Sequence, residues 1–430
     1  MSTAQAIEDN YSKFVIPTYA PEIALVKGSG SRVWDANGRV YYDFGTGISV
    51  NNVGHCHPVV TDAIEKQSKT LMHTSNLYFT ENQGKLAARL SKLNDGGKVF
   101  FCNSGAEANE ALIKLARLHG HEKGRHEIIT MKNSFHGRTL ATVAATGQDK
   151  VKKGFDPEMP GFRHADFNDV TSVAEQINDK TVAILVEAVQ GEGGVIPATE
   201  GFISGLKVLC EEHDLLLMFD EVQCGMGRTG EWFGFQNFSV KPDAFSLSKA
   251  LGGGFPIGAI VASSKVADVL QPGHHASTFG GAPLACSAAL ATLDVIDSEA
   301  LVKRAKTAGA AFKKKLDGLV EKYEHVQEVR GIGLMLGIVL DTDAKPIVDQ
   351  MSEIGLLTLA TAGNVIRILP PLNAKDIEFE EAFEIIDECL AEMHGMDVDD
   401  EDVETEVEAA EDAIPAEASS EEEVVVSDDH

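Results

Sequence analysis

Two apolar segments of the chain end in residues whose side chains can do chemistry. Asp220 follows residues 215–219, and Lys249 follows residues 243–248 and precedes the glycines at 252–254. Both segments are typical of buried strands, and the carboxyl ends of parallel strands meet at one edge of a sheet. A lysine amine can form a Schiff base with an aldehyde, and a carboxylate can hold a pyridinium nitrogen. The pair therefore predicts a site for pyridoxal phosphate.

A helix terminus suited to binding an anion is expected nearby. Ser104 follows an apolar strand and can cap a helix over residues 106–118, with Glu107 as its capping-box partner. The amides of Gly105 and Ala106 would then face outward, where the helix dipole favours an anion. Ordinary capping is the alternative for this segment alone, and the neighbouring lysine and aspartate favour phosphate binding.

Four further residues carry a ring or a charge that could serve such a site. Phe135 could stack on a planar ring, and Arg138 offers a bidentate fork to a carboxylate. Glu187 ends a buried strand, and Arg367 lies within an apolar one at residues 365–369. A buried charge needs a partner, so Glu187 and Arg367 predict either a structural ion pair or a site for a charged substrate.

Two other patterns resemble sites but fit poorly. Residues 225–230 spell the glycine pattern of a dinucleotide site, but no helix is expected after them, which favours a plain turn. His119, His121 and His126 have no standard metal spacing and favour a solvated loop. We therefore expect neither a nicotinamide site nor a metal site.

The composition bounds the class of protein. The chain has 430 residues, of which 43% are hydrophobic, enough for more than one domain. It contains no run of about 18 apolar residues, so no membrane span is expected. The six cysteines are scattered without a Cys-x-x-Cys pair, which indicates free thiols in a reducing cytoplasm.

The charge is concentrated at one end. The net charge is −29, and residues 397–430 contain 16 acidic side chains and no lysine or arginine, leaving −13 for the remainder. Such a segment cannot bury enough apolar surface to order itself, so we expect residues 396–430 to form a disordered tail. A docking segment for a basic partner is the alternative. The acidity argues against nucleic-acid binding.

Strand and helix patterns alternate through the middle of the chain. Apolar strands are expected at residues 99–102, 127–131, 182–186, 215–219 and 243–248, with helices at 106–118 and 202–213. This alternation predicts a mainly parallel sheet covered on both faces. We expect an N-terminal segment (1–60) packed with a smaller α+β domain (297–395), and a large cofactor-binding domain between them (61–296).

With these residues in place, the chain resembles the class III pyridoxal-phosphate aminotransferases, from about residue 26 to residue 392. The resemblance rests on the region of Lys249 and on motifs elsewhere. They are Gly54-His55-Cys56-His57-Pro58, His73-Thr74-Ser75-Asn76-Leu77-Tyr78, Asn133-Ser134-Phe135-His136-Gly137-Arg138, His275-Ala276-Ser277-Thr278-Phe279-Gly280-Gly281 and Arg367 with Pro370-Pro371. It implies the fold-type I architecture.

The resemblance implies a role for each residue around the cofactor. Lys249 would bind the aldehyde and move the substrate's proton, while Asp220 would keep the ring nitrogen protonated. The remaining cofactor-binding residues would be Gly105, Ala106, Phe135, Glu221, Val222, Gln223 and Thr278. Thr278 would come from the neighbouring subunit, which implies a homodimer with shared sites.

The resemblance also implies how substrates bind. Arg138 and Ser277 would hold the substrate's carboxylate end. Arg367 would take the α-carboxylate of 2-oxoglutarate or glutamate, with Glu187 as its switchable partner. Since two substrates of different shape use one pocket, a movable Arg–Glu pair is a physical solution.

The implied donor is N2-acetyl-L-ornithine, with 2-oxoglutarate as acceptor. Other ω-aminotransferases acting on succinylornithine, ornithine, 4-aminobutyrate or acyl-aminoadipate semialdehyde remain open. An aminomutase or racemase, a nicotinamide dehydrogenase built on residues 225–230 and a binding module are more distant alternatives. Cys224, Ala282 and the pair Asn373-Ala374 depart from residues common in the family. These departures bear on the choice of substrate.

Overall fold

The computed structural model describes the backbone of residues 3–400 and the side chains of residues 3–393. Helix α13 (Asp376–Asp400) extends past residue 395, where the smaller domain was expected to end. The first five residues of the predicted disordered tail, 396–400, are therefore helical. The rest of that tail, 401–430, lies outside the described residues.

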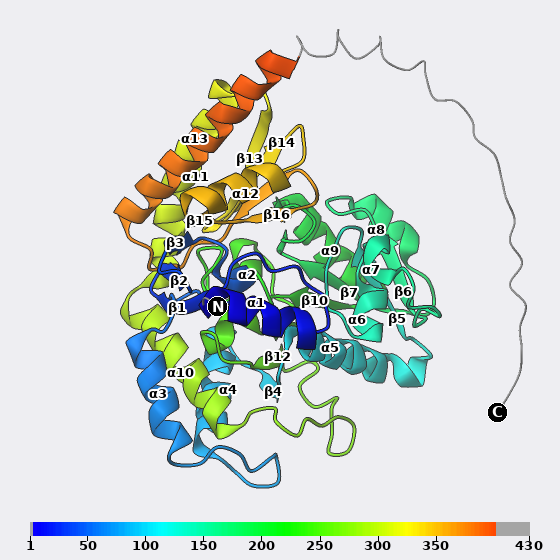
Figure 1. Cartoon of the computed structure of the whole chain (residues 1–430). Helices are drawn as coiled ribbons and strands as arrows, with labels where there is room; N and C mark the ends of the chain where they lie inside the picture. Colours follow the sequence, from blue (N-terminus) through cyan, green and yellow to red (C-terminus); the bar gives the residue numbers. More distant parts are fainter. Residues whose placement is uncertain (1–2, 401–430) are drawn as a thin grey trace, which may run out of the picture.

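A seven-stranded sheet forms the centre of the larger part of the molecule (Figure 1), in the order β4-β12-β11-β10-β7-β5-β6. Only β12 runs against its neighbours, β4 and β11; the other pairings are parallel. The strands are β4 (Lys98–Cys102), β5 (Glu127–Met131), β6 (Phe162–Ala165), β7 (Thr181–Glu187), β10 (Leu216–Asp220), β11 (Ala244–Leu247) and β12 (Gly258–Ala262). The predicted mainly parallel sheet is confirmed.

Both faces of this sheet are covered, which explains its continuous apolar strands. Along β10, Leu216 and Met218 belong to the apolar cluster that contains the buried residues of α5 (Gly105–Gly120). The alternate residues Leu217 and Phe219 belong to the cluster that contains those of α9 (Glu200–His213). Successive side chains of a strand point to opposite faces, so one apolar run serves two layers.

The smaller part of the molecule is built around a second sheet with the order β13-β14-β17-β16. Its pairings are antiparallel, and helices α11, α12 and α13 accompany it in the upper part of Figure 1. The elements are α11 (Leu301–Lys322), β13 (Val326–Ile332), β14 (Met335–Leu340), α12 (Lys345–Ile354), β16 (Leu359–Thr361) and β17 (Val365–Ile368).

The N-terminal segment joins residues far away in sequence. Strand β3 (Val40–Asp43) pairs antiparallel with β2 (Arg32–Asp35) and parallel with β15 (Leu356–Leu357). The segment also contains α1 (Thr3–Phe14), β1 (Leu25–Ser29) and α2 (Thr46–Ser49). The predicted domain boundaries themselves stay a prediction.

The remaining elements connect and cover these sheets. They are α3 (Pro58–Ser68), α4 (Glu81–Leu93), η1 (His121–Lys123), α6 (Leu140–Ala145), α7 (Asp149–Lys152), α8 (Val170–Gln176), β8 (Val189–Gln190), β9 (Ile196–Pro197), η2 (Gly234–Asn237), η3 (Lys249–Gly252) and α10 (Pro283–Ser298). Among residues 3–400, no helix has the length and apolar character needed to cross a membrane.

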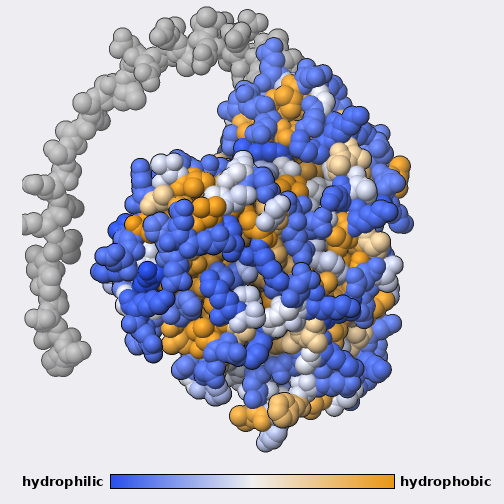
Figure 2. Space-filling model, turned by 180° about the vertical axis from the view of Figure 1, so that it is seen from behind, coloured by the Kyte–Doolittle hydropathy of each residue, from blue (hydrophilic) through white to orange (hydrophobic). Residues whose placement is uncertain are grey.

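Apolar side chains are exposed on the loop between α3 and α4. This loop lies at the lower end of Figure 1, and Figure 2 shows apolar surface at the same end of the molecule. Its exposed large apolar residues are Leu71, Met72, Leu77, Tyr78 and Phe79. Contiguous exposed apolar surface of this kind marks an interaction site.

The glycine-rich turn at residues 225–230 places a buried arginine between three parts of the chain. Arg228 is completely buried and donates hydrogen bonds to Ser49 Oγ (3.0 Å) and Asn52 Oδ1 (2.5 Å) in the N-terminal segment. Its Nη1 donates to the carbonyls of Leu334 (2.9 Å) and Pro370 (2.6 Å). After this turn the chain bends over residues 231–233 and enters the short helix η2.

Replacing Arg228 with methionine is expected to lower the free energy of unfolding by about 2–4 kcal/mol, because buried acceptors would lose their donor. Thermal unfolding, followed by circular dichroism, measures this change. The control is Lys306→Met on the exposed surface, expected to stay within about 0.5 kcal/mol of the parent. An Arg228→Met protein with the parent's stability would show that these bonds do not hold the parts together.

Candidate active site

Lys249 and Asp220 lie at the carboxyl edge of the large sheet, as predicted. Strands β10 and β11 are parallel neighbours with Asp220 opposite Ser246, three residues before Lys249. Lys249 opens η3 with a φ of 41°, a left-handed conformation that costs energy and is often found at functional sites. Burial lowers the pKa of its amine, and the charge of Glu192 opposes that effect.

The Asp220 carboxylate is buried and fully supplied with donors. Its Oδ2 accepts a hydrogen bond from Asn109 Nδ2 (2.7 Å) and lies 2.8 Å from His136 Nδ1. Its Oδ1 accepts one from the backbone N–H of Val222 (3.0 Å). Sequence reasoning missed Asn109 and His136, although both lie in segments that it singled out. Two features of the sequence could have indicated them: Asn109 is a polar residue one helical turn inside α5, and His136 is a polar residue directly after Phe135.

The N-terminus of α5 lies at the same edge of the sheet. Ser104 caps it, since its Oγ accepts from the Glu107 N–H (3.2 Å), and Glu107 in turn accepts from the Asn103 N–H (2.7 Å). The amides of Gly105 and Ala106 belong to the first turn, whose N–H groups have no acceptor inside the helix. A Cβ on Gly105 would lie 2.8 Å from Val222 Cγ1, so the backbone approaches Val222 closely only because this residue is glycine.

Arg367 pairs with a different glutamate from the one expected. Its Nη1 donates to Glu192 Oε1 (2.5 Å) and to Gln223 Oε1 (3.2 Å), and the arginine is buried on β17. Burial would raise the pKa of Glu192, but the Arg367 charge and hydrogen bond outweigh burial and lower it. In this structure the ion-pair partner of Arg367 is therefore Glu192 and not the expected Glu187.

The reason lies in the surroundings of Glu187. It ends β7 directly opposite Asp220 in the sheet register, and its Oε2 accepts only a long hydrogen bond from the Phe135 N–H (3.4 Å). Burial first, and the Asp220 charge second, raise its pKa well above the usual range. Glu187 thus lies against Asp220 and Phe135, while Arg367 forms its ion pair with Glu192.

The other predicted substrate residues have separate contacts. The Arg138 guanidinium lies 5.4 Å from the centre of the Phe135 ring and is exposed. Ser277 Oγ accepts hydrogen bonds from Asn103 Nδ2 (3.2 Å) and the Gly280 N–H (3.0 Å). The adjacent Thr278 is exposed. The structure thus brings Ser277 to the N-terminus of α5.

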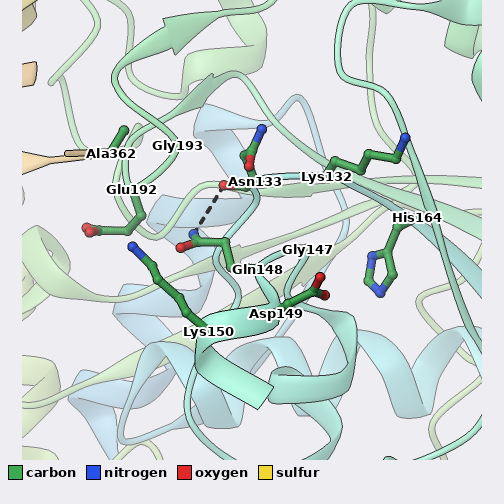
Figure 3. Close-up of a pocket in the computed structure, with 10 residues that line it drawn as sticks. All are labelled: Lys132, Asn133, Gly147, Gln148, Asp149, Lys150, His164, Glu192, Gly193 and Ala362. Atoms are coloured by element: carbon green, nitrogen blue, oxygen red, sulfur yellow. Dashed lines mark hydrogen bonds between the residues drawn. The ribbon is translucent and has the colours of Figure 1, made fainter. Parts of the chain in front are cut away.

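Two neighbouring cavities lie between the large sheet and the smaller part. One has a volume of about 290 Å³ and includes Phe135 and Arg138 in its wall. The other, of about 610 Å³, is the cavity in Figure 3. Both are lined by Gln148, Lys150, Glu192 and Ala362. Through Glu192, the pair of cavities adjoins Arg367.

Glu221, predicted with the cofactor residues, points toward other groups. Its carboxyl oxygens accept from the backbone N–H groups of Gly234 (2.6 Å) and Phe235 (2.8 Å) at the start of η2. Its side chain therefore supports a turn beside the site. A contact between Glu221 and the cofactor therefore stays a prediction, and only for the Glu221 backbone.

The donor set suits pyridoxal phosphate. The site offers an amine for the aldehyde, a carboxylate for the ring nitrogen, and free helix amides for the phosphate, all at one edge of the sheet. Among the described residues, no group of three or more His, Cys, Asp or Glu side chains could hold a metal ion. The three predicted anchors thus agree with one cofactor.

Comparison with known proteins agrees with this chemistry. The family model of the class-III aminotransferases matches residues 16–390. An acetylornithine aminotransferase of Caldanaerobacter subterraneus is 48% identical over 89% of this chain and 98% of its own length. One of Methanocaldococcus jannaschii is 49% identical over 86% of this chain and 94% of its own. A succinylornithine transaminase of Salmonella paratyphi B is 44% identical over 86% and 93%.

Solved structures share the fold. The ornithine aminotransferase of Toxoplasma gondii ME49 superimposes with a TM-score of 0.88 at 34% identity, covering 93% of this chain and 97% of that one. A second Toxoplasma gondii structure, with a TM-score of 0.87 at 35% identity, covers 91% and 95% and has partial occupancy of PLP at its active site. The predicted fold and cofactor are confirmed.

The pH dependence of stability tests the surroundings of Glu221. Burial raises its pKa to about 8, so the folded state favours the protonated group. Its contribution is complete below the unfolded pKa of roughly 4.3 and is lost as the pH rises through about 8. Glu221→Gln cannot titrate, so its unfolding temperature should fall less between pH 5 and pH 9 than that of the parent. The exposed Glu321→Gln is the control, and equal slopes for Glu221→Gln and parent would contradict the assignment.

Proposed function

The chain belongs to the aminotransferase class-III family, and on that basis we propose the reaction that it catalyses. It reversibly transfers the terminal amino group of N2-acetyl-L-ornithine to 2-oxoglutarate, giving N-acetyl-L-glutamate 5-semialdehyde and L-glutamate. Relatives that are 45%, 47%, 48% and 49% identical carry the name acetylornithine aminotransferase, which supports this choice of donor. The reaction is a step of arginine synthesis.

One observation carries the catalytic part of the proposal. Lys249 and the donor-rich Asp220 end neighbouring parallel strands beside the free N-terminus of α5. This arrangement supports Lys249 as the residue that holds the cofactor's aldehyde, Asp220 as the partner of its ring nitrogen, and Gly105 with Ala106 as the phosphate site. Phe135, Val222, Gln223 and the backbone of Glu221 would complete the contacts.

Pyridoxal phosphate, when bound, supplies an aldehyde that takes up an amino group and a ring that withdraws electrons from the adjacent carbon. The Lys249 amine would remove the proton from the substrate carbon that bears the transferred amino group. It would deliver that proton to the carbon on the other side of the nitrogen, a 1,3-proton shift. Its lowered pKa suits this work, because a general base must be partly unprotonated at the working pH. Asn109 and His136 would hold the Asp220 carboxylate in position.

The arginines would divide the substrates between them. Arg138, exposed beside Phe135, would bind the carboxylate of the acylated ornithine. Arg367 would bind the α-carboxylate of 2-oxoglutarate or glutamate after releasing Glu192, and would return to Glu192 when the other substrate is present. Ser277 and Glu187 stay among the proposed substrate residues, with Glu187 beside Phe135.

Exposed apolar surface supports a homodimer that shares its sites. The loop between α3 and α4 leaves Phe79 fully exposed, and Phe279 on the Thr278 loop is 62% exposed. In a dimer, Thr278 would reach the phosphate of the neighbouring subunit. Six free cysteines support a reducing, cytoplasmic location.

Steady-state kinetics test the substrate. We expect N2-acetyl-L-ornithine to give a higher kcat/KM than L-ornithine or 4-aminobutyrate, with 2-oxoglutarate as acceptor. A clear preference for L-ornithine or 4-aminobutyrate would overturn the proposed substrate while leaving the family unchanged.

Replacing Lys249 with alanine is expected to lower kcat by at least about 1000-fold, because both the covalent anchor and the base are lost. Lys249→Arg keeps the charge but stays protonated, so it should be equally inactive. Circular dichroism would establish that both variants are folded. Full activity in either variant would refute the proposed role of the amine.

Mixed dimers test whether Thr278 acts across subunits. Lys249→Ala and Thr278→Glu chains should each be nearly inactive, since the carboxylate introduced by Thr278→Glu would repel the phosphate. When they are mixed, one site of each mixed dimer has an intact lysine and an intact threonine, so activity should rise to about a quarter of the parent value. If mixing restored nothing, each site would have to use its own Thr278.

A further inference from the structure

Arg228 is a buried cation that no step of the proposed reaction uses. Its guanidinium is completely buried, and within the described residues it donates to neutral oxygens and forms no ion pair. A charge removed from water without a counter-charge is costly, so its presence indicates a contact on which the fold depends. Two of its acceptors, the carbonyls of Leu334 and Pro370, belong to the smaller part of the molecule. Arg228 therefore fastens the smaller part to a turn of the larger one.

The turn that Arg228 contacts in the N-terminal segment has a strained backbone. All four residues of α2 (Thr46–Ser49) have a positive φ, between 48° and 65°. A left-handed conformation costs an L-residue about 1–2 kcal/mol, so neighbouring contacts must hold this turn in place. Thr46 Oγ1 donates to the carbonyl of Leu369 (2.8 Å), and Ser49 Oγ accepts from Arg228 Nε (3.0 Å). The two ends of the turn are thus bound to the end of β17 and to Arg228.

These contacts form a closed ring that includes Arg367. Ser49 Oγ donates to the carbonyl of Gln223 (3.3 Å), and the side chain of Gln223 accepts from Arg367 Nη1 (3.2 Å). Arg367 lies on β17, and three residues later the carbonyl of Pro370 accepts from Arg228 (2.6 Å). Since Arg228 also donates to Ser49, the ring is complete. Each of its members limits where the Arg367 guanidinium can lie.

Among the residues proposed to bind substrate, Arg367 alone belongs to the smaller part. Arg138 lies beside Phe135 on the larger part, which also carries Lys249 and Asp220. A change in the contacts that fasten the two parts would therefore displace Arg367 relative to the cofactor site and leave Arg138 in place.

We propose that Arg228 is a positioning residue for Arg367. It holds the end of β17 and the backbone of Gln223 against the strained turn, and this sets the Arg367 guanidinium where the α-carboxylate of 2-oxoglutarate or glutamate binds. Binding of the acylated ornithine through Arg138 does not depend on Arg228. This inference rests on the proposed function, in which Arg367 takes that α-carboxylate.

The test separates the two halves of the reaction in the holoenzyme. In a ping-pong reaction, kcat/KM for each substrate reports the half-reaction of that substrate alone. Arg228→Lys keeps the charge but cannot reach all four acceptors. We expect it to lower kcat/KM for 2-oxoglutarate by about tenfold, the effect of a small misplacement of a binding group. The value for N2-acetyl-L-ornithine should stay within about twofold of the parent value, because its binding group has not moved.

Binding without chemistry gives a second measurement. Glutarate lacks the keto group of 2-oxoglutarate, and N-acetyl-L-norvaline lacks the terminal amine of the donor, so neither compound can react. Calorimetry gives their Kd values with the holoenzyme. Arg228→Lys should weaken glutarate relative to N-acetyl-L-norvaline by the same factor as in the kinetics.

Two further variants separate positioning from stability. Ser49→Ala removes only the hydroxyl of the ring, so it should lower the same ratio by about threefold, and it decides the question if Arg228→Lys does not fold. Val173→Ala leaves a cavity at the buried face of α8 on the larger part, and it should lower stability without changing the ratio.

Equal effects on both substrates and both ligands in Arg228→Lys, or in Ser49→Ala if the lysine variant does not fold, would overturn the positioning role of Arg228. A different result would overturn the proposed function instead: an Arg367→Ala enzyme that keeps the parent value of kcat/KM for 2-oxoglutarate.

Discussion

A buried carboxylate requires hydrogen-bond donors. Asp220 is such a carboxylate, and it lies at the carboxyl edge of the large sheet. Its donors come from three different elements: Asn109 of α5, His136 after β5, and the backbone of Val222 after β10. Satisfying one carboxylate thus fixes the position of α5. Since the proposed phosphate site is the N-terminus of that helix, the same bonds would set its distance from the carboxylate proposed to hold the ring nitrogen.

The pKa values of two glutamates five residues apart shift in opposite directions. Glu187 lies in the sheet beside Asp220, where burial and a like charge favour its neutral form. Glu192 lies on the following loop, where Arg367 favours its charged form. The difference arises from the neighbour that each side chain meets, Asp220 for the buried Glu187 and Arg367 for the partly exposed Glu192. Lys249 experiences the resulting balance of charges, and burial still lowers the pKa of its amine.

Local patterns predicted the strands and the residues that end them. The strand at residues 127–131 coincides with β5, and Asp220 and Lys249 lie at one edge of the sheet as expected, at the end of β10 and just after β11. Choices that depend on distant residues were not readable from local sequence. The antiparallel direction of β12 depends on how the chain returns from η3, and the preference of Arg367 for Glu192 depends on the path of a loop. The side chain of Glu221 turns to η2 for the same reason, because its acceptors are filled by backbone groups 13 and 14 residues away.

The pairing of β3 with β15 has a consequence for how the protein is made. Strand β3 is complete by Asp43, but its partner begins only at Leu356, and the carbonyl of Pro370 that receives Arg228 comes later still. On the ribosome, the N-terminal segment therefore emerges long before the strand beside which it will lie. Contacts between residues so distant in sequence form slowly. Until they form, an unpaired strand edge can pair with another chain. Newly synthesised chains need protection from one another until nearly the whole polypeptide has emerged.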